Sequence, residues 1–261
     1  MRGRLYERYL GIDYSGAMTA DSSLRGLRVY SADGLAGPYE VTPPQGASRY
    51  WSRRGLAQWL VEQLAQSRPT IVGLDHGFSF PWRYFEDNQL ERNWPSFLED
   101  FRRHWPTDEI GVSVEHVRLG KFGSGSIRVG NSRWRRTTEI RVGAKSVFHF
   151  DVPGSVAKST HAGLPWLYQI REQLGSSLHF WPFDGWEVPA GRSVIAEAYP
   201  SLWKSNQPCE GLTPDQRDAW AVANWLREAD HNGKLVEYLQ PPLTTAELEL
   251  ARVEGWILGV L

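Results

Sequence analysis

Two short apolar segments that each end in an aspartate constrain the fold of this chain most strongly. Residues 5–13 end at Asp13, and residues 70–75 end at Asp75. Between them, residues 52–66 carry leucine and tryptophan side chains at helical spacing behind a serine cap, which predicts a helix. A strand, a crossover helix and a second strand favour two parallel neighbouring strands, so both aspartates are expected at one edge of a sheet.

The remaining pattern predicts an α/β chain. Further strands are expected at residues 24–31 and 39–42, because turn signals separate them from their neighbours. More helices are predicted at residues 91–105 and 164–174 and after the capping boxes that begin at Thr213 and Thr244, and a strand is predicted at residues 193–197. We expect one domain, residues 1–261, with a mixed sheet (an antiparallel meander plus parallel strands) that is flanked by helices.

Residues 111–163 are expected to form a β- and loop-rich insertion within this domain, because they combine short strand-like runs with Gly/Ser-rich loops. Within the insertion, residues 118–145 contain eight Lys or Arg against Glu139 alone, a local charge of +7. The whole chain has a net charge of −1, so the remainder carries −8. Near-neutrality therefore does not exclude a polyanionic partner.

Five residues of this basic stretch are candidates for nucleic-acid binding. Arg133, Trp134, Arg135 and Arg136 interleave an aromatic ring with guanidinium groups, and Lys145 follows them. Such a segment can bind phosphates and stack on a base. The alternative is a solvated β-hairpin whose arginines pair with acids elsewhere.

Five carboxylates fall on elements that are expected to converge: Asp13 and Asp75 at strand ends, Glu197 on a strand, and Asp215 and Asp218 on a late helix. Clustered carboxylates repel one another unless a cation neutralises them, and Mg²⁺ or Mn²⁺ does so with oxygen ligands. Two such ions about 4 Å apart can activate a water and stabilise the leaving oxygen of a phosphodiester.

Four of these acids also have a structural alternative, whereas Asp218 lies past the first helical turn, so capping does not account for it. Asp13 or Asp75 alone could begin an Asx-turn after its strand. Asp215 lies in the first turn of its helix, where the helix dipole already favours a negative charge. Glu197, in an apolar strand, could pair with a buried arginine. Only the joint placement of the five acids favours a metal site.

Composition excludes several other classes. A single cysteine, Cys209, rules out a disulfide framework and cysteine-rich zinc sites, and suits a reducing, cytoplasmic location. No apolar run approaches the ~18 residues of a membrane helix, so no membrane partner is expected. The sequence contains neither a His-Glu-x-x-His pair nor a Gly-x-x-x-x-Gly-Lys-Ser/Thr phosphate loop. Most of the 13 tryptophans are expected in the core.

The order of the acids resembles that of the ribonuclease H-like superfamily, with an acid on the first strand, an acid at the end of the fourth, and acids on a late helix. The helix segment Asp215-Gln216-Arg217-Asp218-Ala219 is similar to the Asp-x-x-Asp-Ala helix of Holliday-junction resolvases of that fold. Five segments resemble a family of uncharacterised proteins predicted to be ribonuclease H-like nucleases: Gly11-Ile12-Asp13, Gly73-Leu74-Asp75, Glu197-Ala198-Tyr199-Pro200, Asp218-Ala219 and Glu254-Gly255-Trp256-Ile257. The resemblance covers the core and omits residues 111–163.

This resemblance implies that Asp13, Asp75 and Asp218 bind metal, with Glu197 or Asp215 completing the site. We therefore expect a Mg²⁺- or Mn²⁺-dependent nuclease in which Asp13 bridges two ions and Glu197 or Asp215 orients water. Two other classes stay open. One is an ATP-binding phosphotransferase of the actin-like or sugar-kinase type, which shares this core topology, and the other is a non-catalytic nucleic-acid-binding module.

Overall fold

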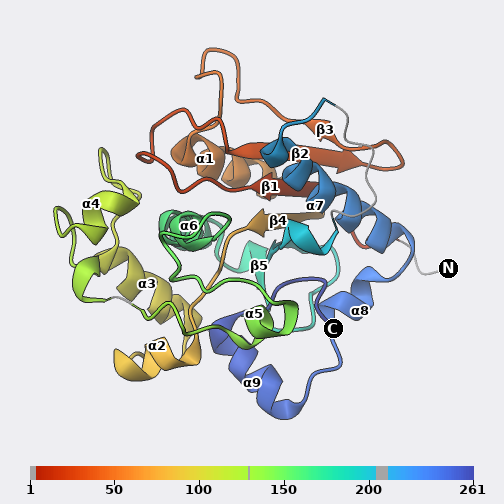
Figure 1. The fold of residues 1–261 in the computed structure, drawn as a ribbon. Helices are drawn as coiled ribbons and strands as arrows, with labels where there is room; N and C mark the ends of the chain where they lie inside the picture. The colour runs from red at the N-terminus through yellow and green to blue at the C-terminus, as the bar shows by residue number, and fades with distance from the viewer. Residues whose placement is uncertain (1–3, 129, 204–210) are drawn as a thin grey trace.

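The computed structural model describes residues 4–128, 130–203 and 211–261. Its centre is a six-stranded sheet in the order β3-β2-β1-β4-β6-β5 (Figure 1). Three antiparallel strands form the meander: β1 (Arg8–Asp13), β2 (Arg28–Asp33) and β3 (Tyr39–Glu40). Three further strands run parallel to β1: β4 (Thr70–Asp75), β6 (Ser193–Glu197) and β5 (Leu178–Trp181). The predicted α/β class and the mixed sheet are thus confirmed.

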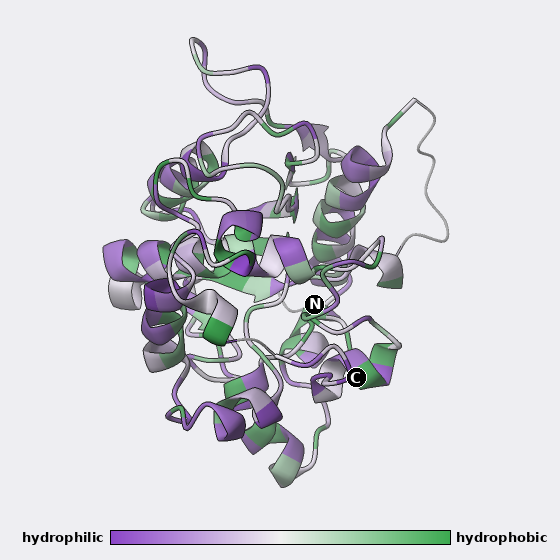
Figure 2. Ribbon diagram, turned by 60° about the vertical axis from the view of Figure 1, so that its left-hand side comes forward, coloured by the Kyte–Doolittle hydropathy of each residue, from purple (hydrophilic) through white to green (hydrophobic). Residues whose placement is uncertain are grey.

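Helices cover both faces of the sheet. One face packs against α1 (Arg53–Leu64), α3 (Trp94–His104) and α6 (Ala157–Leu174), and the other against α7 (Pro214–His231) and α8 (Leu235–Leu239). Because side chains alternate along a strand, Leu10 and Ile12 of β1 join the first core and Tyr9 joins the second. In Figure 2 the strands at the centre are mainly green, whereas the surrounding helices mix purple and green residues.

Helix α7 lies unusually close to the middle of the sheet. A Cβ atom added to Gly11 would lie 2.1 Å from the carbonyl oxygen of Ala219 and 2.5 Å from the backbone nitrogen of Ala223. A Cβ atom on Gly73 would lie 2.5 Å from a methyl group of Val222. The two glycines and the small side chains of α7 therefore allow the helix backbone to contact β1 and β4. The α7 residues that face the sheet are buried: Ala219, Val222, Ala223 and Leu226.

The described residues of the insertion are mostly loop, as expected, but they form short helices and no strand, so the expected β content is wrong. They form α4 (Val114–Arg118), the 3₁₀ turn η1 (Gly125–Ile127), α5 (Thr137–Val142) and the first turns of α6. Local caps explain the difference, because Ser113 accepts a hydrogen bond from the His116 amide and Glu139 accepts one from the Arg136 amide. An isolated bridge between Thr19 and Ser113 joins the insertion to the start of the chain.

Other elements were not predicted or differ at their ends. The helices α2 (Trp82–Asp87) and α8 and the strand β5 were not predicted, and α6 begins seven residues before the predicted helix at residues 164–174. The last helix, α9 (Thr245–Glu254), begins at its predicted capping box. Two short 3₁₀ turns, η2 (Gly175–Ser177) and η3 (Pro200–Leu202), follow α6 and β6. Among the helices that the structure describes, none is long and apolar enough to cross a membrane.

A buried histidine lies within the aromatic core next to α6. The ring centroid of His161 lies 4.5 Å from Trp105, 4.6 Å from Phe150 and 5.0 Å from Phe80. Its Nδ1 lies 2.8 Å from the carbonyl oxygen of Ala157. Burial lowers the pKa of His161 from 6.5 to about 3, so the native state holds the neutral imidazole.

This histidine predicts acid sensitivity of the folded state. The pKa of His161 is lower in the folded than in the unfolded chain. Its contribution to the free energy of unfolding is therefore fully present above pH 6.5 and is lost as the pH falls toward 3. On going from pH 7.5 to pH 5, protonation of His161 in the unfolded chain should lower the free energy of unfolding by about 2 kcal/mol. The His161→Phe variant should therefore lose about 2 kcal/mol less over this range than the wild type. Urea denaturation of both proteins at the two pH values measures the difference. Parallel losses in the two proteins would contradict the prediction.

Candidate metal centre

Three aspartates from three elements meet at the carboxyl edge of the parallel strands. Asp13 ends β1 and Asp75 ends β4, and the two residues are direct partners in the register of these strands. Asp218 lies in the second turn of α7. One carboxylate oxygen of each residue lies within 4.8 Å of one from each of the other two, and all three residues are half-buried. The predicted convergence of these three acids is confirmed.

The Gly-x-Asp spacing on β1 and β4 explains this meeting. Residues two apart on a strand face the same side of the sheet, so Asp13 lies on the face of Gly11, and Asp75 lies on the face of Gly73. The glycines admit α7 to that face, and Asp218 directly precedes Ala219, whose carbonyl oxygen lies against Gly11. The Gly-x-Asp spacing thus places Asp13 and Asp75 on the same face of the sheet as α7, which carries Asp218.

This group has the donor chemistry of a site for a hard divalent cation. Mg²⁺ and Mn²⁺ bind carboxylate oxygens, and Mg²⁺ commonly uses one or two carboxylates together with water and phosphate oxygens. Three carboxylates within 4.8 Å of one another can surround one ion or share two. Asp13, Asp75 and Asp218 are the residues that would hold it.

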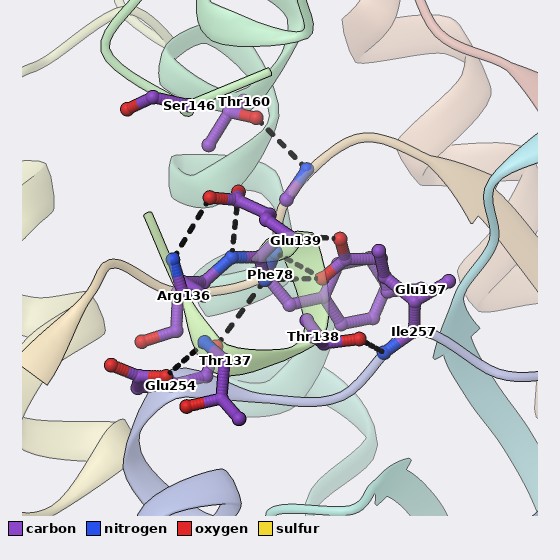
Figure 3. A network of polar contacts seen from close by, with 12 residues as sticks. Phe78, Arg136, Thr137, Thr138, Glu139, Ser146, Thr160, Glu197, Glu254 and Ile257 are labelled. Atoms are coloured by element: carbon purple, nitrogen blue, oxygen red, sulfur yellow. Dashed lines mark hydrogen bonds and ion pairs between the residues drawn. The ribbon is translucent and has the colours of Figure 1, made fainter. Parts of the chain in front are cut away.

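Glu197 does not join this group, which corrects the expectation that it binds metal or orients water. It ends β6 beside β4, but its side chain is buried against Arg136 (Figure 3). Arg136 donates from Nη1 to Oε2 at 2.6 Å and from Nη2 to Oε1 at 2.5 Å, and the Phe78 amide donates to Oε2 at 3.1 Å. Both carboxylate oxygens are therefore already bound, as the buried-arginine alternative anticipated.

Asp215 lies outside the three-aspartate group but close to it. It lies in the first turn of α7 and lines a cleft of about 560 Å³ together with Asp13. The lining also includes Ser159 and Lys158, whose Nζ lies 2.7 Å from a carboxylate oxygen of Glu115. The cleft thus places a lysine and hydroxyl groups beside one of the three aspartates. Lys158 and Ser159 lie in the first turn of α6, and no sequence motif marks their place in the cleft.

The basic candidates are divided between surface and core. Arg133 and Arg135 are exposed, Lys145 is exposed and donates to the Pro153 carbonyl, and Trp134 is half-buried against the core. Arg136 is 1% exposed, so its expected role on a nucleic-acid surface is wrong. It lies between two buried glutamates and has no surface to offer a phosphate.

Four of the eight basic residues in the stretch 118–145 form ion pairs with acids, as the structural alternative anticipated. The paired residues are Arg118 with Glu115 and Asp151, Arg128 with Asp100, Arg136 with Glu139 and Glu197, and Arg141 with Glu247. Within residues 4–128, 130–203 and 211–261, no acidic side chain lies within 4.0 Å of the charged groups of Arg133 or Arg135. These two arginines, like the exposed Lys121 and Lys145, belong to the part of the basic stretch that faces solvent.

No family model, curated protein or solved structure matches this chain. Its function must therefore be argued from the geometry of the three aspartates and of the cleft beside them.

Proposed function

We propose that this chain is a divalent-metal-dependent nuclease with a ribonuclease H-like core, which hydrolyses phosphodiester bonds of nucleic acid with Mg²⁺ or Mn²⁺. The observation that carries the proposal is the group formed by Asp13, Asp75 and Asp218. Its members lie on the first strand, the fourth strand and a late helix, around a sheet that begins as an antiparallel meander and continues with parallel strands. That placement is the one implied by the ribonuclease H-like resemblance.

In this proposal the three carboxylates bind the metal, and the cleft binds the nucleic acid. Asp13, Asp75 and Asp218 would hold the cation, which when bound lowers the pKa of a water and offsets charge on the scissile phosphate. The cleft of about 560 Å³ beside Asp13 has room for a nucleotide. Lys158, which also lines the cleft, is about half exposed, and its ammonium group can attract a phosphate oxygen of the bound strand.

Arg133 and Arg135 support nucleic acid as the partner, and they supply a prediction. Arg133→Ala/Arg135→Ala should weaken the binding of a short DNA or RNA in proportion to lost phosphate contacts. The slope of log affinity against log salt concentration should flatten by about 0.7–0.9 for each arginine that contacts a phosphate. A filter-binding series in salt measures both quantities. Arg141→Ala, which removes an arginine already paired with Glu247, is the control and should leave the slope unchanged.

One experiment tests the proposed function against its rivals. Mn²⁺ is titrated into the wild-type protein by calorimetry, and the loaded protein is then incubated with single-stranded and double-stranded DNA, RNA, a four-way junction and ATP. Metal binding with cleavage of a nucleic acid supports the nuclease. ATP turnover without cleavage would favour the phosphotransferase, and nucleic-acid binding without metal would favour the non-catalytic module. Absence of both Mn²⁺ binding and cleavage contradicts the proposal.

A further inference from the structure

A buried arginine of the insertion, Arg136, lines a small cavity together with Asp75 of the three-aspartate group. Arg136 contacts Glu197 at the end of β6, and its Nε donates to Glu139 of α5 at 2.9 Å (Figure 3). Its Nη1 also lies 3.3 Å from the carbonyl oxygen of Glu254 in α9. Burial by itself would lower the pKa of Arg136, but the two carboxylates outweigh that effect and raise it, so the guanidinium stays charged. Arg136 therefore joins the insertion, the sheet and the C-terminal helix.

Glu197 transmits this contact to the segment that follows Asp75. Its Oε2 accepts a hydrogen bond from the Phe78 amide, three residues after Asp75. Its neighbour in the register of β4 and β6 is Leu74, and the Ala198 amide donates to the Leu74 carbonyl at 2.9 Å. Leu74 and Phe78, on either side of Asp75 in the sequence, are thus both hydrogen-bonded to residues at the end of β6.

A second anchor comes from α6. The Gly77 amide donates to Oγ1 of Thr160 at 2.8 Å. A small cavity of about 20 Å³, enough for a single water, has Asp75, Glu197 and Arg136 on its walls. Arg136 and Asp75 therefore line the same small cavity, together with the Glu197 side chain.

We propose that Arg136 is a positioning residue for the metal centre: through Glu197 it fixes the β4 end and so the carboxylate of Asp75. The inference rests on the proposed metal site. Neither Arg136 nor Glu197 touches the metal in this arrangement. Groups that orient metal ligands typically change metal affinity by 10- to 100-fold when they are replaced.

A competing arrangement makes the opposite prediction. If Glu197 were itself a metal ligand that Arg136 withholds, weakening the arginine would release a carboxylate toward the ion, and metal affinity would rise. If Glu197 positions Asp75, weakening the arginine loosens the β4 end, and metal affinity falls. The direction of the change therefore distinguishes the two roles.

The test measures the affinity of Mn²⁺ alone, by calorimetry, for the wild type and three variants below their unfolding temperatures. Arg136→Lys keeps the charge but cannot bridge two carboxylates with a planar fork. Glu197→Gln leaves one buried arginine with one buried glutamate, so it should fold even where an arginine variant does not. Asp230→Asn is the control, because it removes a buried carboxylate that binds the Tyr6 amide and the Tyr9 hydroxyl at the other end of α7. It lies twelve residues from Asp218, or about 18 Å along the helix.

We expect Arg136→Lys and Glu197→Gln to raise the Kd for Mn²⁺ about tenfold, and Asp230→Asn to change it less than twofold despite its own loss of stability. Folded Arg136→Lys protein with wild-type or tighter Mn²⁺ binding would overturn the positioning role. Wild-type protein that binds no Mn²⁺ would overturn the proposed function, and this inference with it. The two failures are thus separate, because the first requires a wild type that binds the metal.

Discussion

Asp13→Asn is expected to abolish Mn²⁺ binding and to lower the rate of metal-dependent cleavage by about a thousandfold or more. Asp13 lies on β1, one of the two central strands, and it is the member of the group that lines the cleft of about 560 Å³. Asparagine keeps the shape of the side chain but removes the negative charge that a hard cation requires. A bound metal supplies several kcal/mol of transition-state stabilisation, and about 4 kcal/mol corresponds to a thousandfold in rate.

The matched control is Asp33→Asn. Asp33 ends β2 opposite Arg8, at the far end of β1 from Asp13, and its carboxylate accepts a hydrogen bond from Arg68 at 2.8 Å. Loss of this partly exposed ion pair should cost at most about 1 kcal/mol of stability and leave metal binding intact. Calorimetry with Mn²⁺ and a cleavage assay compare the two variants. Wild-type Mn²⁺ affinity in Asp13→Asn would place the metal elsewhere.

Gly11→Ala is expected to cause the largest loss of stability among single-methyl substitutions in the sheet. The new Cβ would lie 2.1 Å from the Ala219 carbonyl oxygen and 2.5 Å from the Ala223 nitrogen. Both are backbone atoms of α7, so no side-chain rotation relieves the contact, and the helix must move as a body. We expect a loss of at least about 3 kcal/mol, the upper part of the range for overpacking.

This substitution also tests the link between packing and the metal centre. Because α7 carries Asp218, a shift of the helix away from β1 should weaken Mn²⁺ binding in whatever folded protein remains. Gly37→Ala is the control, since no atom lies within 4 Å of its added Cβ. Thermal unfolding with and without Mn²⁺ measures both effects, and a fall of about 6–12 °C in melting temperature corresponds to the expected loss. An unchanged melting temperature would contradict the close contact.

The secondary structure of the core could be predicted because its signals are local. Strands β4 and β6 have the predicted bounds, and the capping boxes at Thr213 and Thr244 mark the beginnings of α7 and α9. The convergence of Asp13 and Asp75 could also be predicted, because a strand, a helix and a parallel strand bring equivalent strand ends together. Predicting these features requires only the pattern of neighbouring residues and the topology of one crossover.

Predictions failed where the partner of a residue is distant in the chain. The short helices α4 and α5 of the insertion were not predicted, because they have few apolar residues at helical spacing. Arg136 has the same sequence signal as the exposed Arg135 beside it, yet it contacts Glu197, 61 residues away. Periodicity and charge counts describe a segment alone, and they carry no information on which acid a buried guanidinium will meet.

The sequence by itself determined the core strands β1, β4 and β6, the two Gly-x-Asp ends and the helix that carries Asp218, because each depends on side-chain spacing along a short segment. Tertiary structure alone decided which acids share a site. Asp218 joins the strand ends because glycines at positions 11 and 73 admit α7 to that face of the sheet. Glu197 is withheld from the group because a charge inside the protein requires a buried partner, and the fold places Arg136 against it.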